Sequence, residues 1–236
     1  MRKEPFAFGS FVHVVKRGAR GLSIVEDDND RNRFLLMLTH FNDEYCSLNW
    51  YRDLLNEKLH ATFDRPSQWP ERKRLVNIIA FCLLDNHFHL LLEEISDGGT
   101  ARFMKRLGTG MAKRYNEKYN SKGSLFQGAY RARVIAADRY LRYVSAYIQV
   151  KNAFEMCEGG YARACSEFDR SYQWAASHSY CSLGDYMGNY TRPIIERGLL
   201  SDMFTHTEYR DFCRDIVLGR TEIPEDVLSH FTGFFE

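Results

Sequence analysis

The run His87-Phe88-His89-Leu90-Leu91-Leu92-Glu93 constrains the fold of this 236-residue chain more than any other feature. Successive side chains of a β-strand point to opposite faces of a sheet. The two imidazoles would therefore emerge on one face, while Phe88, Leu90 and Leu92 face the other. The pattern predicts a strand that holds two histidines on the opposite side from an apolar core.

The composition, with 44% hydrophobic residues, is typical of a globular protein with one substantial core. No segment approaches the ~20 apolar residues of a membrane span, and residues 1–5 lack the apolar stretch of a secretory signal. The six cysteines show no Cys-x-x-Cys spacing, which favours reduced thiols over a disulfide framework or a structural zinc site. We therefore expect a cytoplasmic protein without a membrane partner.

The formal net charge of +1 hides a strong segregation of charge along the chain. Between residues 101 and 143, eleven lysine and arginine residues accompany two acidic ones. Aromatic residues are interleaved with them, namely Tyr115, Tyr119, Phe126 and Tyr130. This mixture suits a groove that follows a nucleic-acid backbone and stacks unpaired bases, although a charge run is more often a solvated face.

Periodicity predicts strands at residues 11–15, 76–84, 87–94 and 131–135, and helices at 28–45, 51–60, 101–119 and from Asp138 onward. Residues 76–94 fit either two strands joined by a tight turn or one bent strand. Thr100 is the expected N-cap of the third helix. Glycines in the basic loop at residues 16–21 suit close contact with a phosphate. After Glu155 the pattern weakens into short helical pieces that continue to an acidic end at 222–236.

A histidine pair on a strand can hold a metal ion, although hydrogen-bonded structure is its commoner use. Two neutral imidazoles and one oxygen or amide ligand suit Mg²⁺ or Mn²⁺, which polarises a substrate phosphate. A tyrosine near such a phosphate becomes a workable nucleophile. Tyr140, Tyr143 and Tyr147 share one predicted helix face, so core packing explains all three, and spacing alone selects none.

Three ordered motifs carry a family resemblance: residues 87–93, then Gly123-Ser124-Leu125-Phe126-Gln127-Gly128-Ala129-Tyr130-Arg131, then Tyr140-Leu141 and Tyr147-Ile148. In this order they resemble the REP-associated tyrosine transposases, which are single-tyrosine members of the HUH endonuclease superfamily. The similarity covers roughly residues 8–155.

The resemblance implies an α+β fold, with a ferredoxin-like antiparallel sheet and packed helices in a catalytic domain at residues 1–155. A helical C-terminal extension would occupy residues 156–236. Members of the family cut single-stranded DNA at hairpin-forming ends with the help of a metal ion, leaving a covalent 5′-phosphotyrosine and a free 3′-hydroxyl. Because the link keeps the energy of the broken phosphodiester, strand transfer needs no nucleotide cofactor.

Carried over by position, the resemblance assigns the nucleophile to Tyr147 and metal ligation to His87 and His89. The chain departs from the family one turn later, where Lys151 replaces an asparagine that completes the metal site in relatives and Asn152 replaces the following proline. Either Asn152 becomes the third ligand through a small helix distortion, or water fills the position, or Lys151 neutralises phosphate charge. Of these three, the sequence weakly favours Asn152.

The expected partner is single-stranded or hairpin DNA, and the sequence leaves open a monomer or a homodimer. The residues expected to contact DNA are Arg17, Arg20, Lys105, Arg106, Arg131 and Arg133. A second hypothesis, motivated by Lys151, is a domesticated DNA-binding protein that has lost catalysis. A phosphoesterase acting on small molecules is disfavoured, because the chain lacks a nucleotide or sugar motif and that function leaves the basic segment unexplained.

Overall fold

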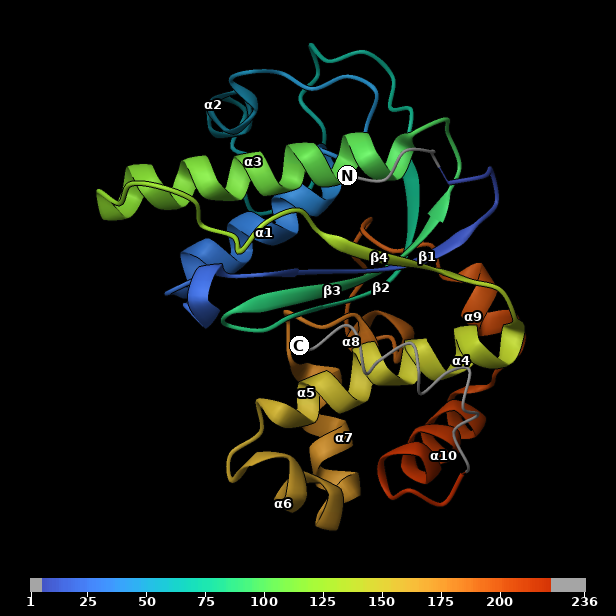
Figure 1. Cartoon of the computed structure of the whole chain (residues 1–236). Helices are drawn as coiled ribbons and strands as arrows, with labels where there is room; N and C mark the ends of the chain where they lie inside the picture. The colour runs from blue at the N-terminus through green and yellow to red at the C-terminus, as the bar shows by residue number, and fades with distance from the viewer. Residues whose placement is uncertain (1–5, 222–236) are drawn as a thin grey trace.

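The computed structural model describes residues 6–221, so residues 1–5 and the predicted acidic end at 222–236 lie outside the described part of the chain. Within it, one antiparallel sheet has the order β2-β3-β1-β4 (Figure 1). Its strands are β1 (Phe11–Arg17), β2 (Val76–Leu83), β3 (His87–Glu94) and β4 (Arg131–Ile135). Helices follow β1 and β3, so the chain runs β-α-β-β-α-β with a ferredoxin-like strand order, which confirms the predicted α+β class.

Strands β2 and β3 are two strands joined by a tight turn, which decides between the alternatives that the sequence left open. Along β3 the side chains alternate as predicted. Phe88, Leu90 and Leu92 enter the core on one face of the sheet, whereas Leu91 joins a separate core on the other face. The histidines of β3 are therefore on the same side as Leu91.

The first face of the sheet is covered by α1 (Asp28–His40) and α3 (Gly99–Tyr119), with α2 (Trp50–Asn56) beside them (Figure 1). Phe34 and Leu38 of α1 and Phe103 of α3 are buried with Phe88 in one apolar core. The Asp27 side chain caps α1 by accepting a hydrogen bond from the Asp30 N–H at 3.0 Å.

Helix α1 ends at His40, five residues before the predicted end at Tyr45. The cause is Asn42, whose carbonyl oxygen accepts the backbone N–H groups of Leu75 and Val76 at 3.0 Å each, while its amide donates to the Val76 carbonyl. A side chain that satisfies backbone groups elsewhere draws the chain out of the helix.

Two other predicted helix boundaries are wrong. Helix α3 begins at Gly99 with Gly98 at the N-cap, and Thr100 lies inside the first turn, where its N–H donates to the Glu94 carboxylate at 3.0 Å. Helix α2 ends at Asn56 instead of residue 60, because Lys58 adopts a left-handed conformation with a φ of 59°.

The second face of the sheet carries α4 (Asp138–Ala146), the π-helical turn η2 (Tyr147–Lys151) and α5 (Asn152–Glu155) (Figure 1). The rest of the described chain packs around them as short helices. These are α6 (Gly160–Ser166), α7 (Phe168–Ser177), α8 (Leu183–Tyr186), α9 (Gly198–Met203) and α10 (His206–Val217).

Residues 156–221 form short helices as predicted, and they are attached to the sheet at the edge strand β2. The Leu83 N–H donates to the Tyr180 carbonyl and the Ser182 N–H donates to the Phe81 carbonyl, both at 2.9 Å. Tyr172 of α7 and Tyr209 of α10 share one core with η2. The division into units at residues 155 and 156 stays a prediction.

Within residues 6–221, no helix combines the length and the apolar character needed to cross a membrane. The six cysteines, which all lie in the described region, are free thiols, as their spacing predicted.

Candidate active site

The register of the sheet gathers polar side chains on its second face. His87 of β3 stands opposite Arg17 of β1, and His13 of β1 stands opposite Arg133 of β4. Residues paired across antiparallel strands point to the same face. His89 lies two residues after His87 and so shares this face, which is the one that η2 covers.

The His87 imidazole is fixed by its neighbour in the turn. Its Nδ1 lies 2.6 Å from Oδ1 of Asn86, and Nδ2 of the same amide donates to the Gly21 carbonyl at 3.3 Å. Because Asn86 thus offers an acceptor to the ring, Nδ1 of His87 donates and Nε2 keeps its lone pair. Burial lowers the pKa of His87 to about 4, so the ring is neutral at neutral pH.

His89 is fully buried and paired with a third histidine. Nε2 of His13 lies 2.9 Å from Nδ1 of His89, and the two rings stack with centroids 5.2 Å apart. Burial holds the pKa of His89 well below its usual value. The pair orients the His89 ring and keeps it neutral, which a metal ligand requires.

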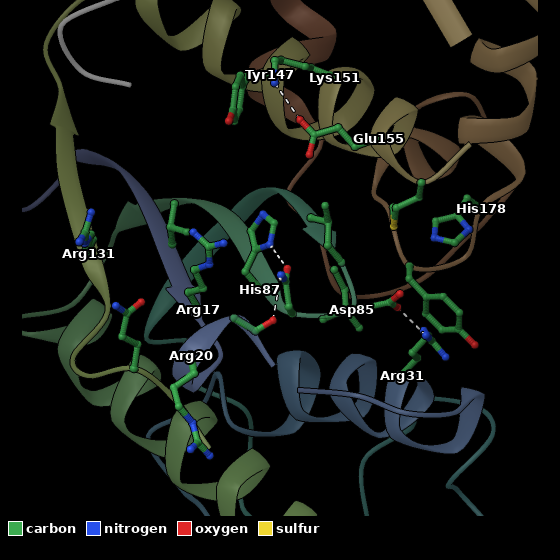
Figure 2. Close-up of a pocket in the computed structure, with 18 of the residues that line it drawn as sticks. Arg17, Arg20, Arg31, Asp85, His87, Arg131, Tyr147, Lys151, Glu155 and His178 are labelled. Carbon is green, nitrogen blue, oxygen red and sulfur yellow. Dashed lines mark hydrogen bonds and ion pairs between the residues drawn. The ribbon is translucent and has the colours of Figure 1, made fainter. Parts of the chain in front are cut away.

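Tyr147, the predicted nucleophile, lies against these histidines. Its ring centroid is 5.6 Å from that of His89 and 6.2 Å from that of His13, both in edge-on contact. Figure 2 shows its hydroxyl directed into the cavity above His87. Burial, with a smaller contribution from the charge of Glu155, raises the pKa of Tyr147, so the phenol is protonated at neutral pH.

Tyr147 begins a π-helical turn, in which the Asn152 N–H bonds to the Tyr147 carbonyl five residues earlier. Lys151 and Glu155 line the cavity together with Tyr147, and their side chains form an ion pair at 2.8 Å (Figure 2). Asn152 is 1% exposed and outside this lining, and within residues 6–221 its Nδ2 has no hydrogen-bond partner. The turn therefore presents Lys151 to the cavity, and Asn152 to the protein interior.

The cavity between η2 and the sheet has a volume of about 1510 Å³. Arg17, Arg20 and Arg131 line one side of it (Figure 2). Within the described residues, Arg17 and Arg20 have no acidic partner within ion-pair distance, so their charges are available to a phosphate.

A tight loop after β1 carries Arg20 into this position. The Gly18 N–H donates to the Asn86 carbonyl at 2.7 Å, which ties the loop to the turn before His87. A Cβ on Gly18 would lie 2.1 Å from the Leu22 carbonyl oxygen, so only glycine fits there. The loop at residues 16–21 therefore lies beside the histidines, as expected of a phosphate-contacting segment.

The basic segment at residues 101–143 does not form a single groove. Lys105 and Arg106 lie on α3, across the sheet from the cavity (Figure 1). Arg106 donates to the backbone carbonyls of Asp43 and Glu44. The Tyr119 hydroxyl donates to the Asp30 carboxylate of α1 at 2.6 Å. On β4, Arg131 and Arg133 pair with Val15 and His13 and so point to the opposite face of the sheet from α3, which means that the two parts of the segment face different surfaces.

For the predicted metal ion, the structure provides two neutral imidazoles as donors. Among the described residues, no group of three histidine, cysteine, aspartate or glutamate side chains is close enough to hold an ion. His87 and His89 fit the chemistry of a divalent cation, with ring centroids 5.0 Å apart. The third ligand is not assembled.

Three polar residues at the site were not among the site residues predicted from the sequence. His13 interrupts the apolar run of β1, and Asn86 precedes the histidine pair directly, so both carried a local signal. Glu155 lies eight residues after Tyr147 and four after Lys151, the spacing of one helix face. That periodicity could have placed it in the cavity.

Residues 51–151 match the family whose description is "Transposase IS200 like". The match includes His87, His89, Tyr147 and Lys151. The resemblance to the transposases is thereby confirmed over this segment of 101 residues.

A search of solved structures finds a likeness to a REP-associated tyrosine transposase bound to a REP hairpin. The two sequences are 10% identical, the alignment covers 83% of this chain and 93% of that one, and the TM-score is 0.39. A search of curated proteins finds no match.

Proposed function

We propose that this protein is a metal-dependent single-stranded DNA endonuclease and strand transferase that acts at hairpin-forming ends. The observation that carries the proposal is the edge-on contact of Tyr147 with His89 at a cavity lined by arginines. The predicted nucleophile, the neutral imidazole of His87 and the guanidinium groups of Arg17 and Arg20 then border one space. The location of these groups on three separate segments of the chain argues against coincidental packing.

The histidines would hold Mg²⁺ or Mn²⁺, which supplies Lewis-acid polarisation of the scissile phosphate when bound. Asn86 and His13 keep the two rings in fixed tautomers and orientations. Arg17 and Arg20 bind the phosphate oxygens and neutralise charge as it develops.

Tyr147 is the attacking group. Its phenolic oxygen forms a bond to phosphorus while the bond from phosphorus to the 3′-oxygen breaks. The phenolic proton is lost, and the leaving 3′-oxygen gains a proton to become a free hydroxyl. The products are a 5′-phosphotyrosine and a 3′-end, and attack by another 3′-hydroxyl on the link reverses the reaction with a new strand.

Of the three alternatives for the place of the missing asparagine, which are ligation by Asn152, a water ligand, or charge neutralisation by Lys151, the position of Lys151 supports the last. The Lys151 ammonium lines the cavity and cannot ligate a cation while protonated. Its ion pair with Glu155 holds it 4.9 Å from the Tyr147 ring centroid. From there the ammonium can stabilise negative charge on the phosphate.

The test is incubation of the protein with hairpin-ended oligonucleotides and Mn²⁺, followed by denaturing electrophoresis. We expect a covalent protein–DNA adduct that the Tyr147→Phe variant does not form. Tyr143→Phe, on the same helix face, is the matched control and should form the adduct as the parent does. An adduct from Tyr147→Phe would refute the assignment of the nucleophile.

A domesticated DNA-binding protein is the second candidate. It is favoured by the Lys151–Glu155 ion pair at the place where relatives carry an amide ligand. Tight binding of hairpin DNA without cleavage under Mg²⁺, Mn²⁺ or other divalent ions would select this alternative.

A further inference from the structure

The cavity has a second lobe that the proposed chemistry does not use. Trp174, His178 and Tyr180 line it, and all three come from the chain after Glu155. Figure 2 shows His178 and Arg31 on the opposite side of the cavity from Arg17, Arg20 and Arg131. Asp85 and Asn86, in the turn before β3, line the same cavity as both groups of residues, so one ligand can contact both sides.

Trp174 and His178 form a ready-made stack. Their ring centroids are 4.8 Å apart with an interplanar angle of 20°. Trp174 is 36% exposed, and the other large apolar side chains that are exposed in the described region do not line the cavity. His178 covers one face of the indole, and the exposed part of the indole lines the cavity. An exposed indole in a cavity is the kind of platform on which an unpaired base stacks.

His178 forms the largely buried half of this stack. Its Nε2 is shielded from water and has no hydrogen-bond partner among residues 6–221. Burial, together with the nearby Arg31, lowers the pKa of His178, so the ring is neutral at neutral pH. The neutral His178 ring therefore supports the Trp174 indole from one side without adding charge to the cavity.

The charge of this lobe suits a base better than a phosphate. Arg31 forms ion pairs with Asp85 at 2.6 Å and with Asp28 at 3.6 Å. Its charge is therefore matched by two carboxylates, both of which line the cavity. The carboxylates repel a phosphate, yet they accept hydrogen bonds from the amino group of a base.

We propose that this lobe binds one unpaired nucleobase of the DNA strand next to the scissile phosphate, stacked on Trp174. The inference rests on the proposed function, since it requires single-stranded DNA at Tyr147. The acidic side chains Asp28 and Asp85 favour guanine, adenine or cytosine, which carry amino groups, over thymine. The region after Glu155 thus forms part of the substrate site.

The experiment measures binding of hairpin oligonucleotides with and without a short single-stranded extension. Trp174→Ala should weaken binding of the extended hairpin about tenfold or more, whereas Trp174→Phe should retain most of the affinity. The blunt hairpin should bind both variants like the parent. An abasic site at one position of the extension should remove the difference between Trp174→Ala and parent, and thymine there should bind more weakly than guanine.

Tryptophan fluorescence gives an independent readout, because Trp50 and Trp69 are buried whereas Trp174 is exposed. The extended hairpin should quench the parent protein more strongly than Trp174→Phe. Equal losses on blunt and extended hairpins, or none on either, would overturn the inference. Adduct formation with unchanged binding by Trp174→Ala would refute the base site alone, while quenching without any adduct would refute the proposed catalysis alone.

Discussion

The two faces of the sheet have opposite characters although the same strands build both. On the face under α1 and α3, Phe88, Leu90 and Leu92 are closed into an apolar core. On the face under η2, His87 borders a cavity with arginines at its side, and His89 is buried behind it. Because side chains alternate along a strand, one short run of sequence provides the core and the candidate site at the same time. Neighbouring residues of β3 should therefore affect different properties when they are replaced.

The largest effect is expected on the cavity face. His87→Ala should reduce cutting by on the order of 10⁴-fold, because loss of a cation ligand removes several kcal/mol of transition-state stabilisation. Binding of hairpin DNA should largely persist, since the phosphate contacts come from arginine. The measurements are adduct formation and gel-shift affinity. We expect the same loss of cutting from His89→Ala. Cutting equal to the parent by His87→Ala would show that this histidine does not belong to the proposed site.

The adjacent residue should produce the reverse pattern. Phe88 is fully buried and contacts Phe34 with ring centroids 5.2 Å apart. Phe88→Ala should lower the free energy of unfolding by about 3–5 kcal/mol through lost burial and a residual cavity. Urea denaturation measures this change in the free energy of unfolding, and His87→Ala is the comparison variant. If His87→Ala destabilises the protein equally, the functional difference between the two faces is not supported.

A smaller effect is expected at Lys151. Lys151→Asn removes the ammonium, releases Glu155 and brings an amide to the turn after Tyr147, so half-maximal cutting should need about tenfold less Mn²⁺. Lys113→Asn is the control, because Lys113 also pairs with a glutamate four residues later, on α3. An equal response of both variants would show that the effect does not come from the cavity.

The smallest effect distinguishes the two surfaces of the basic segment. Arg131 lines the cavity, whereas Lys105 is exposed on α3. The salt dependence of binding is measured as the slope of log affinity against log salt concentration. Arg131→Ala should reduce the magnitude of this slope by about one, and Lys105→Ala should leave it unchanged. A larger change for Lys105→Ala would place DNA on the α3 face.

The sheet was predictable because its register follows from alternation of polar and apolar residues, as along β3. The end of α1 was not, because Asn42 forms hydrogen bonds with residues more than thirty positions away. The π-helical turn at Tyr147 likewise has no local sequence pattern, so only the three-dimensional packing shows that Lys151 lines the cavity and Asn152 does not. Trp174 lies far along the chain in a weakly patterned region, and only the fold brings it to the cavity.

The attachment of residues 180–182 to β2 has a consequence for how this protein can be divided. A strand at the edge of a sheet exposes unpaired backbone groups that can recruit another strand. Here those groups are occupied from within the same chain. Shortening the polypeptide after Glu155 would uncover this edge together with an apolar surface, which favours self-association. The sheet and its C-terminal cover would thus be inherited as one unit, and a shortened chain would need a replacement cover.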